Sequence, residues 1–237
     1  MTPAVINPVR AVIFDMDGLL VDTVPIWRQV GNGAFAALGV DIAPLAKSGA
    51  VMGLSVVDAM AVFRNYAGWP ASEHPDLEER IIAGVVDAIH HQLELKPGAD
   101  QALDFCDAAG LLMAVASGSS TPIIEAVLDR FDLAKRFTAV CSAAAEPRGK
   151  PHPGVFLSAA AAMGVAPEDC LVLEDAVSGC IAGKAASMRV IAVPDGPAVG
   201  DPRLAIADLV VVSLEELTGE PARAVMGLRL NPPDAAR

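Results

Sequence analysis

Aromatic residues, cysteines and long apolar runs are all scarce in this sequence. Only 4% of its 237 residues are Phe, Trp or Tyr. No apolar run approaches the roughly 20 residues that a membrane-spanning helix needs. The N-terminal stretch MTPAVINPVR has no basic flank before an apolar block, so we expect no signal peptide and no membrane partner. The four cysteines, Cys106, Cys141, Cys170 and Cys180, form no CxxC pair, which is typical of buried, reduced thiols in a cytoplasmic protein.

Positive charge is scarce as well. The chain has 17 Lys and Arg against 29 Asp and Glu, a net charge of −12. Such an acidic chain is not expected to bind nucleic acid or an anionic membrane surface. A small anionic ligand remains compatible with the sequence, but its binding site must then supply positive charge locally. We expect a monomer or a weak homo-oligomer.

Short apolar runs recur along the chain, and helix-length segments separate the later ones. Near-continuous apolar strands that alternate with helices indicate a parallel sheet with both faces covered. The sequence therefore predicts an α/β protein with a Rossmann-like parallel sheet, whose ligands bind beyond the carboxyl ends of the strands. The predicted strands span residues 9–14, 111–116, 139–142, 171–173, 190–193 and 209–212.

One long segment interrupts this alternation and contains no convincing strand. Pro25 suits the first turn of a helix that runs to residue 38, and Ser55 suits the cap of a second helix. We predict a core domain of residues 1–24 and 96–237 and an inserted helical cap domain of residues 25–95. A helical block inserted directly after the first strand would lie over the end of that strand as a lid.

Acidic residues follow the first predicted strand in the stretch VIFDMDG. Asp15 and Asp17 can both reach one pocket where the strand ends. A carboxylate can act as a nucleophile in phosphoryl transfer, and a second acid two residues later can give a proton to the leaving oxygen. The alternative is an ordinary loop of solvated acids or a helix N-cap.

Two other strand ends carry polar residues that fit the same chemistry. Ser117 and Gly118 follow the second predicted strand, and Thr121 and Pro122 suit the N-cap and the first residue of the following helix. Free backbone N–H groups and a hydroxyl at such a place bind phosphate oxygens, although ordinary helix capping explains them equally well.

The acids at the fourth strand end suit a magnesium site. Asp175, Asp15 and a backbone carbonyl near Asp17 would provide the oxygen ligands that Mg²⁺ prefers, and Glu174 either ligates the ion or holds a metal-bound water. Capping of the next helix is again the alternative. Lys150, in the proline-rich turn RGKPHPG, is the best candidate to neutralise a phosphate, although taken alone a lysine is more often on the surface.

Taken together, the stretches DMDGLLVD, VASGSS, GKPHP and LEDAVSG resemble the four ordered motifs of the haloacid dehalogenase (HAD) superfamily. The resemblance covers nearly the whole chain and includes the small helical cap after the first motif. It implies that Asp15 is the nucleophile, Asp17 the general acid and base, Ser117 a phosphate ligand and Lys150 the charge stabiliser. It also implies Mg²⁺ as cofactor, held by Asp15, the carbonyl of Asp17, and Asp175.

Within that superfamily the second acid, Asp17, implies phosphate ester substrates, because members that cleave halides or phosphonates lack it. The stretches LGVDI, GLS and SMRVIAVP look like the bacterial hexitol and 2-deoxyglucose-6-phosphate phosphatase group. One departure is Val24, which stands where that group usually carries Glu. The expected function is thus hydrolysis of a small phosphorylated sugar or sugar alcohol.

Two other functions stay open at this point. A phosphosugar mutase of the β-phosphoglucomutase type shares every core motif, but by resemblance it carries a basic residue in the cap near Ser55, where this chain reads MGLSVVDAM. A non-catalytic phosphosugar-binding protein would be expected to lack Asp15 or Asp17, and both are present.

Overall fold

The computed structural model describes residues 7–48, 56–70 and 72–228. Its centre is a parallel sheet of six strands in the order β3-β2-β1-β4-β5-β6. The predicted α/β fold with a parallel sheet is confirmed, and every strand lies within three residues of its predicted bounds. The strands are β1 Ala11–Phe14, β2 Leu112–Ser117, β3 Ala139–Ser142, β4 Cys170–Glu174, β5 Arg189–Ala192 and β6 Leu209–Val210.

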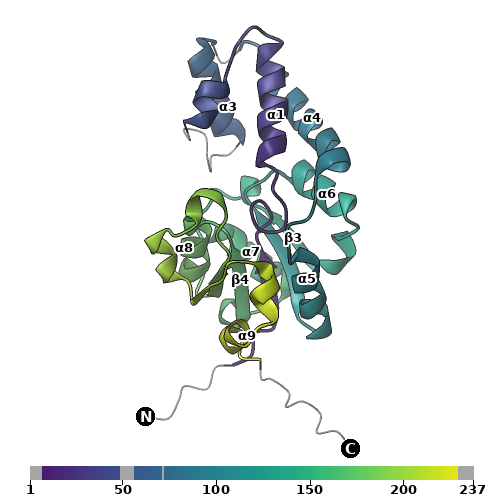
Figure 1. The fold of residues 1–237 in the computed structure, drawn as a ribbon, viewed down its shortest axis with the longest axis vertical. Helices are drawn as coiled ribbons and strands as arrows, with labels where there is room; N and C mark the ends of the chain where they lie inside the picture. Colours follow the sequence, from purple (N-terminus) through teal and green to yellow (C-terminus); the bar gives the residue numbers. More distant parts are fainter. Residues whose placement is uncertain (1–6, 49–55, 71, 229–237) are drawn as a thin grey trace, which may run out of the picture.

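Helices cover both faces of this sheet (Figure 1). Successive side chains of a strand point to opposite faces, so Val12 and Phe14 of β1 belong to one apolar cluster and Ala11 and Ile13 to the other. The first cluster includes side chains of α5, α6 and α9, and the second includes those of α7 and α8. These helices are α5 Ala99–Ala108, α6 Thr121–Arg130, α7 Gly154–Met163, α8 Val177–Ala185 and α9 Glu220–Met226.

The remaining helices gather beyond the carboxyl end of the sheet, at one end of the molecule (Figure 1). They are α1 Val24–Ala36, α2 Ala43–Lys47, α3 Val56–Ala67 and α4 Leu77–Gln92. The described residues between β1 and α5 form no strand of the sheet, as the sequence predicts. The predicted cap at Ser55 lies outside the described residues.

An aromatic cluster and a close helix pair hold these four helices together. Phe35 of α1 stacks on Trp69 with ring centroids 5.6 Å apart, and it also contacts Phe63 of α3 at 5.3 Å. Helices α1 and α4 approach each other at Gly84, where a Cβ atom would lie only 2.9 Å from Val30. These contacts pack the helices together, and the aromatic side chains belong to the same apolar cluster as Val12 and Phe14 of β1.

The chain passes between the sheet and these helices twice, and the two passages lie side by side. Val21 and Leu95 form an antiparallel bridge, and the backbone N–H of Lys96 donates to the carbonyl of Leu20 at 2.8 Å. The ammonium of Lys96 also binds Asp195, in the loop after β5, at 2.5 Å. We propose that the core domain and the helical cap domain join at this pair of segments.

Among the described residues, no helix is both long enough and apolar enough to span a membrane. The four cysteines are unpaired. Cys106, Cys170 and Cys180 are buried as predicted, but Cys141 is half-buried, because it lies on the edge strand β3.

Candidate active site

The predicted site residues meet because their strands are neighbours. β1 pairs with β2 on one side and with β4 on the other. Asp15 directly follows β1, Ser117 ends β2 and Glu174 ends β4. Since the strands are parallel, these residues share the carboxyl edge of the sheet, where α/β proteins bind their ligands.

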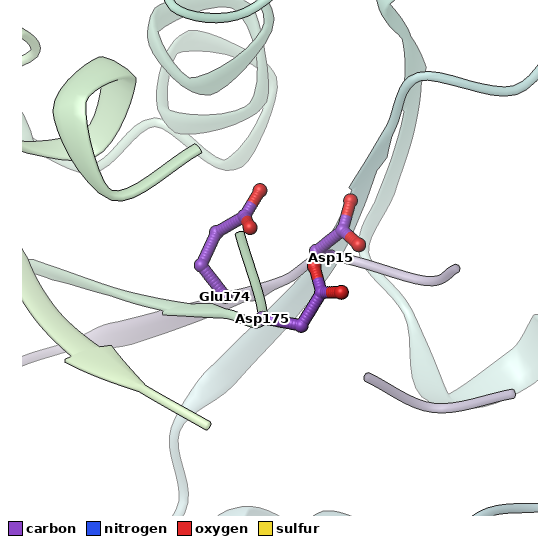
Figure 2. A group of neighbouring side chains, drawn as sticks. All are labelled: Asp15, Glu174 and Asp175. Carbon is purple, nitrogen blue, oxygen red and sulfur yellow. The ribbon is translucent and has the colours of Figure 1, made fainter. Parts of the chain in front are cut away.

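Three acids form a cluster at this edge. Oxygens of Asp15, Glu174 and Asp175 lie within 4.8 Å of one another, and Figure 2 shows the three side chains reaching the same space from the ends of β1 and β4. Asp15 is only 5% exposed and Glu174 only 1%. Burying several carboxylates together is unfavourable unless positive charge lies among them.

Lys150 provides part of that charge. Its Nζ donates to Oδ1 of Asp15 and to Oε1 of Glu174, both at 2.6 Å, and to the carbonyl of Ala116 at 3.1 Å. The ammonium also lies 4.9 Å from the centre of the Phe156 ring. The lysine side chain is only 11% exposed, so the surface alternative considered for Lys150 is wrong. The proline-rich turn before α7 directs it into the site.

One lysine does not balance three acids, and the pKa values of the carboxyls show the imbalance. Burial raises the pKa of Asp15 from 3.8 to about 7; Lys150 opposes this shift, while Glu174 and Asp17 add to it. Burial, followed by the charges of Asp15 and Glu174, raises the pKa of Asp175 from 3.8 to about 9. The cluster therefore has an affinity for additional positive charge.

The donor set fits a hard divalent cation. The available ligands are carboxylate oxygens, and no cysteine or histidine belongs to this cluster. Oxygen donors with excess negative charge are what Mg²⁺ and Ca²⁺ select. Both oxygens of Glu174 already have partners, since Oε1 accepts from Lys150 and Oε2 accepts from the N–H of Ala176. This favours Asp15 and Asp175 as direct ligands over Glu174.

Two glycines allow the cluster to form. At Gly18, where φ is +88°, a Cβ atom would lie 2.1 Å from Oδ2 of Asp175. At Gly179, in α8, it would lie 1.8 Å from Oε1 of Glu174. The backbone can approach these acids so closely only because glycine has no side chain. Sequence reasoning missed the part played by Gly179, because the stretch AVSGCIAGKAA contains several small residues without a sign of which one faces Glu174.

Asp17 is held separately, by hydroxyl groups. Its Oδ1 accepts a hydrogen bond from Thr23, and its Oδ2 accepts from Ser119 at 2.7 Å and from Ser117 at 3.1 Å. Sequence reasoning did not single out Thr23 or Ser119. The only available signal was the density of hydroxyls around Ser117, which also suits helix capping.

The loop after β2 presents groups that suit an anion. Ser117 is fully buried, and its Oγ also accepts from the N–H of Ser119 at 3.0 Å. Gly118 is exposed, and nothing lies within 4 Å of the place where its Cβ would be. The expectation that Thr121 caps α6 is wrong by one residue: Ser120 has extended backbone angles and occupies the N-cap, so that Thr121 is the first helical residue.

Comparisons with known proteins agree with this architecture. Residues 9–187 match the family model of haloacid dehalogenase-like hydrolases. Hexitol phosphatase B of Escherichia coli K12 is 40% identical over 212 residues, which cover 90% of this chain and 96% of that protein.

Solved structures give the same result for the fold. The crystal structure of CbbY from Rhodobacter sphaeroides in complex with phosphate matches with a TM-score of 0.81 and 27% identity, and covers 93% of this chain and 100% of that one. A second structure of that protein, in complex with xylulose-(1,5)-bisphosphate, matches with a TM-score of 0.80, 27% identity, and 94% and 100% coverage. The resemblance seen in the four sequence motifs is confirmed: the chain belongs to the haloacid dehalogenase-like hydrolase family.

Proposed function

We propose that this hydrolase is a Mg²⁺-dependent phosphatase that acts on small phosphorylated sugars or sugar alcohols through an aspartyl phosphate on Asp15. One observation carries the proposal. The Asp15 carboxylate lies at a strand end between the Lys150 ammonium and two further acids, while Asp17 stands two residues on with its carboxylate held by hydroxyls. Nucleophile, cation site and proton donor are therefore adjacent.

Asp15, Asp175 and the backbone carbonyl of Asp17 would hold the ion. When bound, Mg²⁺ supplies the positive charge that offsets repulsion between the Asp15 carboxylate and an incoming phosphoryl group. Glu174 would hold Lys150 and, through it, keep the ammonium beside Asp15.

In the first step the Asp15 carboxylate attacks phosphorus, and the bond from phosphorus to the substrate oxygen breaks. Asp17 gives its proton to that leaving oxygen. Lys150, the hydroxyl of Ser117 and the backbone N–H of Gly118 bind the phosphoryl oxygens while charge shifts among them.

In the second step Asp17, now ionised, takes a proton from a water molecule as that water attacks the phosphorus of the aspartyl phosphate. The bond from phosphorus to Asp15 breaks, which frees inorganic phosphate and restores both carboxyl groups to their starting states. Asp15 and Asp17 thus each act in both steps of one turnover.

The relatives support the substrate class. Hexitol phosphatase B carries its substrate class in its name, and the two CbbY structures hold phosphate and a sugar bisphosphate. We infer that residues 25–95 form a cap that closes over the site and contacts the leaving group. Val24, at the start of α1, is 53% exposed and stands where the hexitol phosphatase group usually carries Glu.

The test is phosphate release from a panel of esters: mannitol and sorbitol phosphates, 2-deoxyglucose 6-phosphate and β-glucose 1-phosphate. We expect inorganic phosphate from hexitol or hexose esters with Mg²⁺ and none with EDTA. Asp15→Asn, which keeps the shape of the side chain, is expected to be folded and inactive. Conversion of β-glucose 1-phosphate to glucose 6-phosphate without phosphate release, followed by NMR, would identify a mutase instead.

A further inference from the structure

The Asp17 carboxylate accepts hydroxyl hydrogen bonds from three different parts of the chain. Thr23 precedes α1, Ser117 ends β2, and Ser119 lies in the loop between β2 and α6. Thr23 occupies the N-cap position of α1 but makes no side-chain hydrogen bond to that helix. Its hydroxyl is used for Asp17 instead.

Ser119, in the loop after β2, is held through both of its backbone polar groups. Its backbone N–H donates to Oγ of Ser117 at 3.0 Å. Its carbonyl accepts from the hydroxyl of Ser142 at 2.6 Å, and Ser142, only 8% exposed, ends the neighbouring strand β3. The Ser142 oxygen in turn accepts from the N–H of Ala144. Ser119 is therefore fixed from two adjacent strands, β2 and β3.

The other two hydroxyl donors, Ser117 and Thr23, are subject to further demands during turnover. Ser117 is proposed to bind a phosphoryl oxygen, which would draw its hydroxyl away from the longer, 3.1 Å bond to Asp17. Thr23 adjoins the first cap helix, so its position depends on how the cap stands over the core. Among the described residues, the Ser119 hydroxyl donates its hydrogen bond to the Asp17 carboxylate and forms none with the carboxylates of Asp15 or Asp175 or with the helical cap.

We propose that Ser119 is a positioning residue: anchored through Ser142, its hydroxyl fixes the Asp17 carboxyl group in the place from which it transfers a proton to the leaving oxygen. This inference rests on the proposed function, because it presupposes the acid–base role of Asp17. General acid catalysis requires the donor to lie within hydrogen-bond reach of the leaving oxygen, and small displacements lower the rate strongly.

The leaving group offers a specific test. An alkoxide from a sugar alcohol is a strong base and needs a proton as its bond to phosphorus breaks. p-Nitrophenolate is stabilised by its own ring and nitro group and leaves without one. The value of kcat/KM reports the steps up to transfer of the phosphoryl group to Asp15. Misplacement of Asp17 should therefore lower kcat/KM for a hexitol phosphate and spare that for p-nitrophenyl phosphate.

We expect Ser119→Ala to lower kcat/KM for the hexitol phosphate on the order of 10- to 100-fold. For p-nitrophenyl phosphate the expected loss is under about threefold, since no proton is needed. Ser119→Thr keeps the hydroxyl and should restore most of the hexitol phosphate activity. Ser120→Ala is the matched control, because the neighbouring Ser120 hydroxyl is buried and makes no hydrogen bond; it should leave both activities unchanged.

The outcomes separate this inference from the function on which it rests. Equal losses on both substrates, or no loss on either, would overturn the positioning role of Ser119 and leave the phosphatase proposal standing. If Asp17→Asn keeps the hexitol phosphate activity of the wild type, the acid–base role of Asp17 is wrong and the inference falls with it. Activity on p-nitrophenyl phosphate also reports whether the Ser119 and Ser120 variants are folded.

Discussion

At the scale of single residues, the site depends on an incomplete charge balance around Asp15. Lys150 contacts Asp15 and Glu174 at 2.6 Å each, but Asp175 has no such partner among the described residues. The burial that raises the pKa of Asp15 and of Asp175 also makes these carboxyls bind protons when no metal is present. Metal and protons therefore compete for the same oxygens.

This competition predicts how stability depends on pH. In the folded, metal-free protein the pKa values are about 7 for Asp15 and about 9 for Asp175, against 3.8 for each as an ordinary carboxyl. The folded state thus holds more protons than the unfolded state between those values, and the free energy of unfolding falls as pH rises from about 4 to about 9. Burial lowers the pKa of Lys150, but Asp15 and Glu174 outweigh it and the net shift is upward, so the lysine stays charged throughout.

Calorimetric melting in EDTA across this pH range measures the effect. The Tm of the metal-free protein is expected to fall toward alkaline pH, and the increase in Tm caused by Mg²⁺ is expected to grow. Asp175→Asn removes one of the two carboxyls and should flatten both trends. A metal-free Tm that rises with pH would contradict the charge balance described for Asp15 and Asp175.

Residue identities at the site were largely predictable, and their contacts were not. Asp15, Ser117 and Asp175 could be recognised because each ends an apolar run, and strand ends of a parallel sheet share one edge. That Lys150 is buried, and that Ser119 contacts Asp17, depend on the register of β1 against β2 and on the path of the loop before α7. Local sequence does not encode either of these.

At the scale of secondary-structure elements, the close approach of α8 to the end of β4 builds the acidic side of the site. Gly179, in the first turn of α8, lies against the Glu174 carboxylate. Glu174 in turn accepts from the N–H of Ala176, just before α8. The helix and the strand end therefore form one unit that holds Lys150.

Gly179→Ala should disrupt this unit, because the new Cβ would lie 1.8 Å from Oε1 of Glu174. Either Glu174 turns away from Lys150 or α8 shifts, and we expect a loss of about 1–3 kcal/mol in the free energy of unfolding. Phosphatase activity should fall with it, since Lys150 would lose one of its two carboxylate partners. Denaturant unfolding and phosphate release measure the two effects.

Gly33→Ala provides the matched control. Gly33 lies within α1, it is exposed, and nothing lies within 4 Å of its absent Cβ. Alanine in a helix interior is more favourable than glycine by about 0.5–1 kcal/mol, so this variant should be slightly more stable and fully active. A Gly179→Ala protein with wild-type stability and activity would show that α8 does not need to approach Glu174 so closely.

The elements themselves were predictable where periodicity and end signals agree. Strands came from short apolar runs, and α1 came from Pro25, which suits the first turn of a helix. The start of α6 was misplaced by one residue, because Ser120 and Thr121 are both good N-cap residues and only the backbone angles distinguish them.

At the scale of the whole molecule, the candidate site lies at the carboxyl edge of the sheet, on the side where α1, α3 and α4 gather (Figure 1). Two adjacent passages of the chain, bridged between Val21 and Leu95, join these helices to the sheet. The sequence predicted a helical insertion here, but the packing of α4 against α6 depends on side chains that meet only in the folded chain.

The overall acidity of the chain suits the proposed chemistry only because positive charge is concentrated in the site. With a net charge of −12, the protein surface repels anionic metabolites in general. Lys150 and a bound divalent cation would make this edge of the sheet an exception, and a phosphorylated metabolite would bind there in preference to the rest of the surface.

The central claim is that Asp15 becomes phosphorylated, and it can be tested by mass spectrometry. Asp17→Asn can still receive a phosphoryl group from p-nitrophenyl phosphate in the presence of Mg²⁺, because that leaving group needs no proton, but it lacks the base that activates water. We expect this variant to gain the mass of one phosphoryl group, located on the peptide that contains Asp15. The gain should disappear when Asp15 is also changed to Asn. A phosphoryl group on any other residue, or sustained release of p-nitrophenol from Asp17→Asn with no phosphorylated protein, would contradict the account.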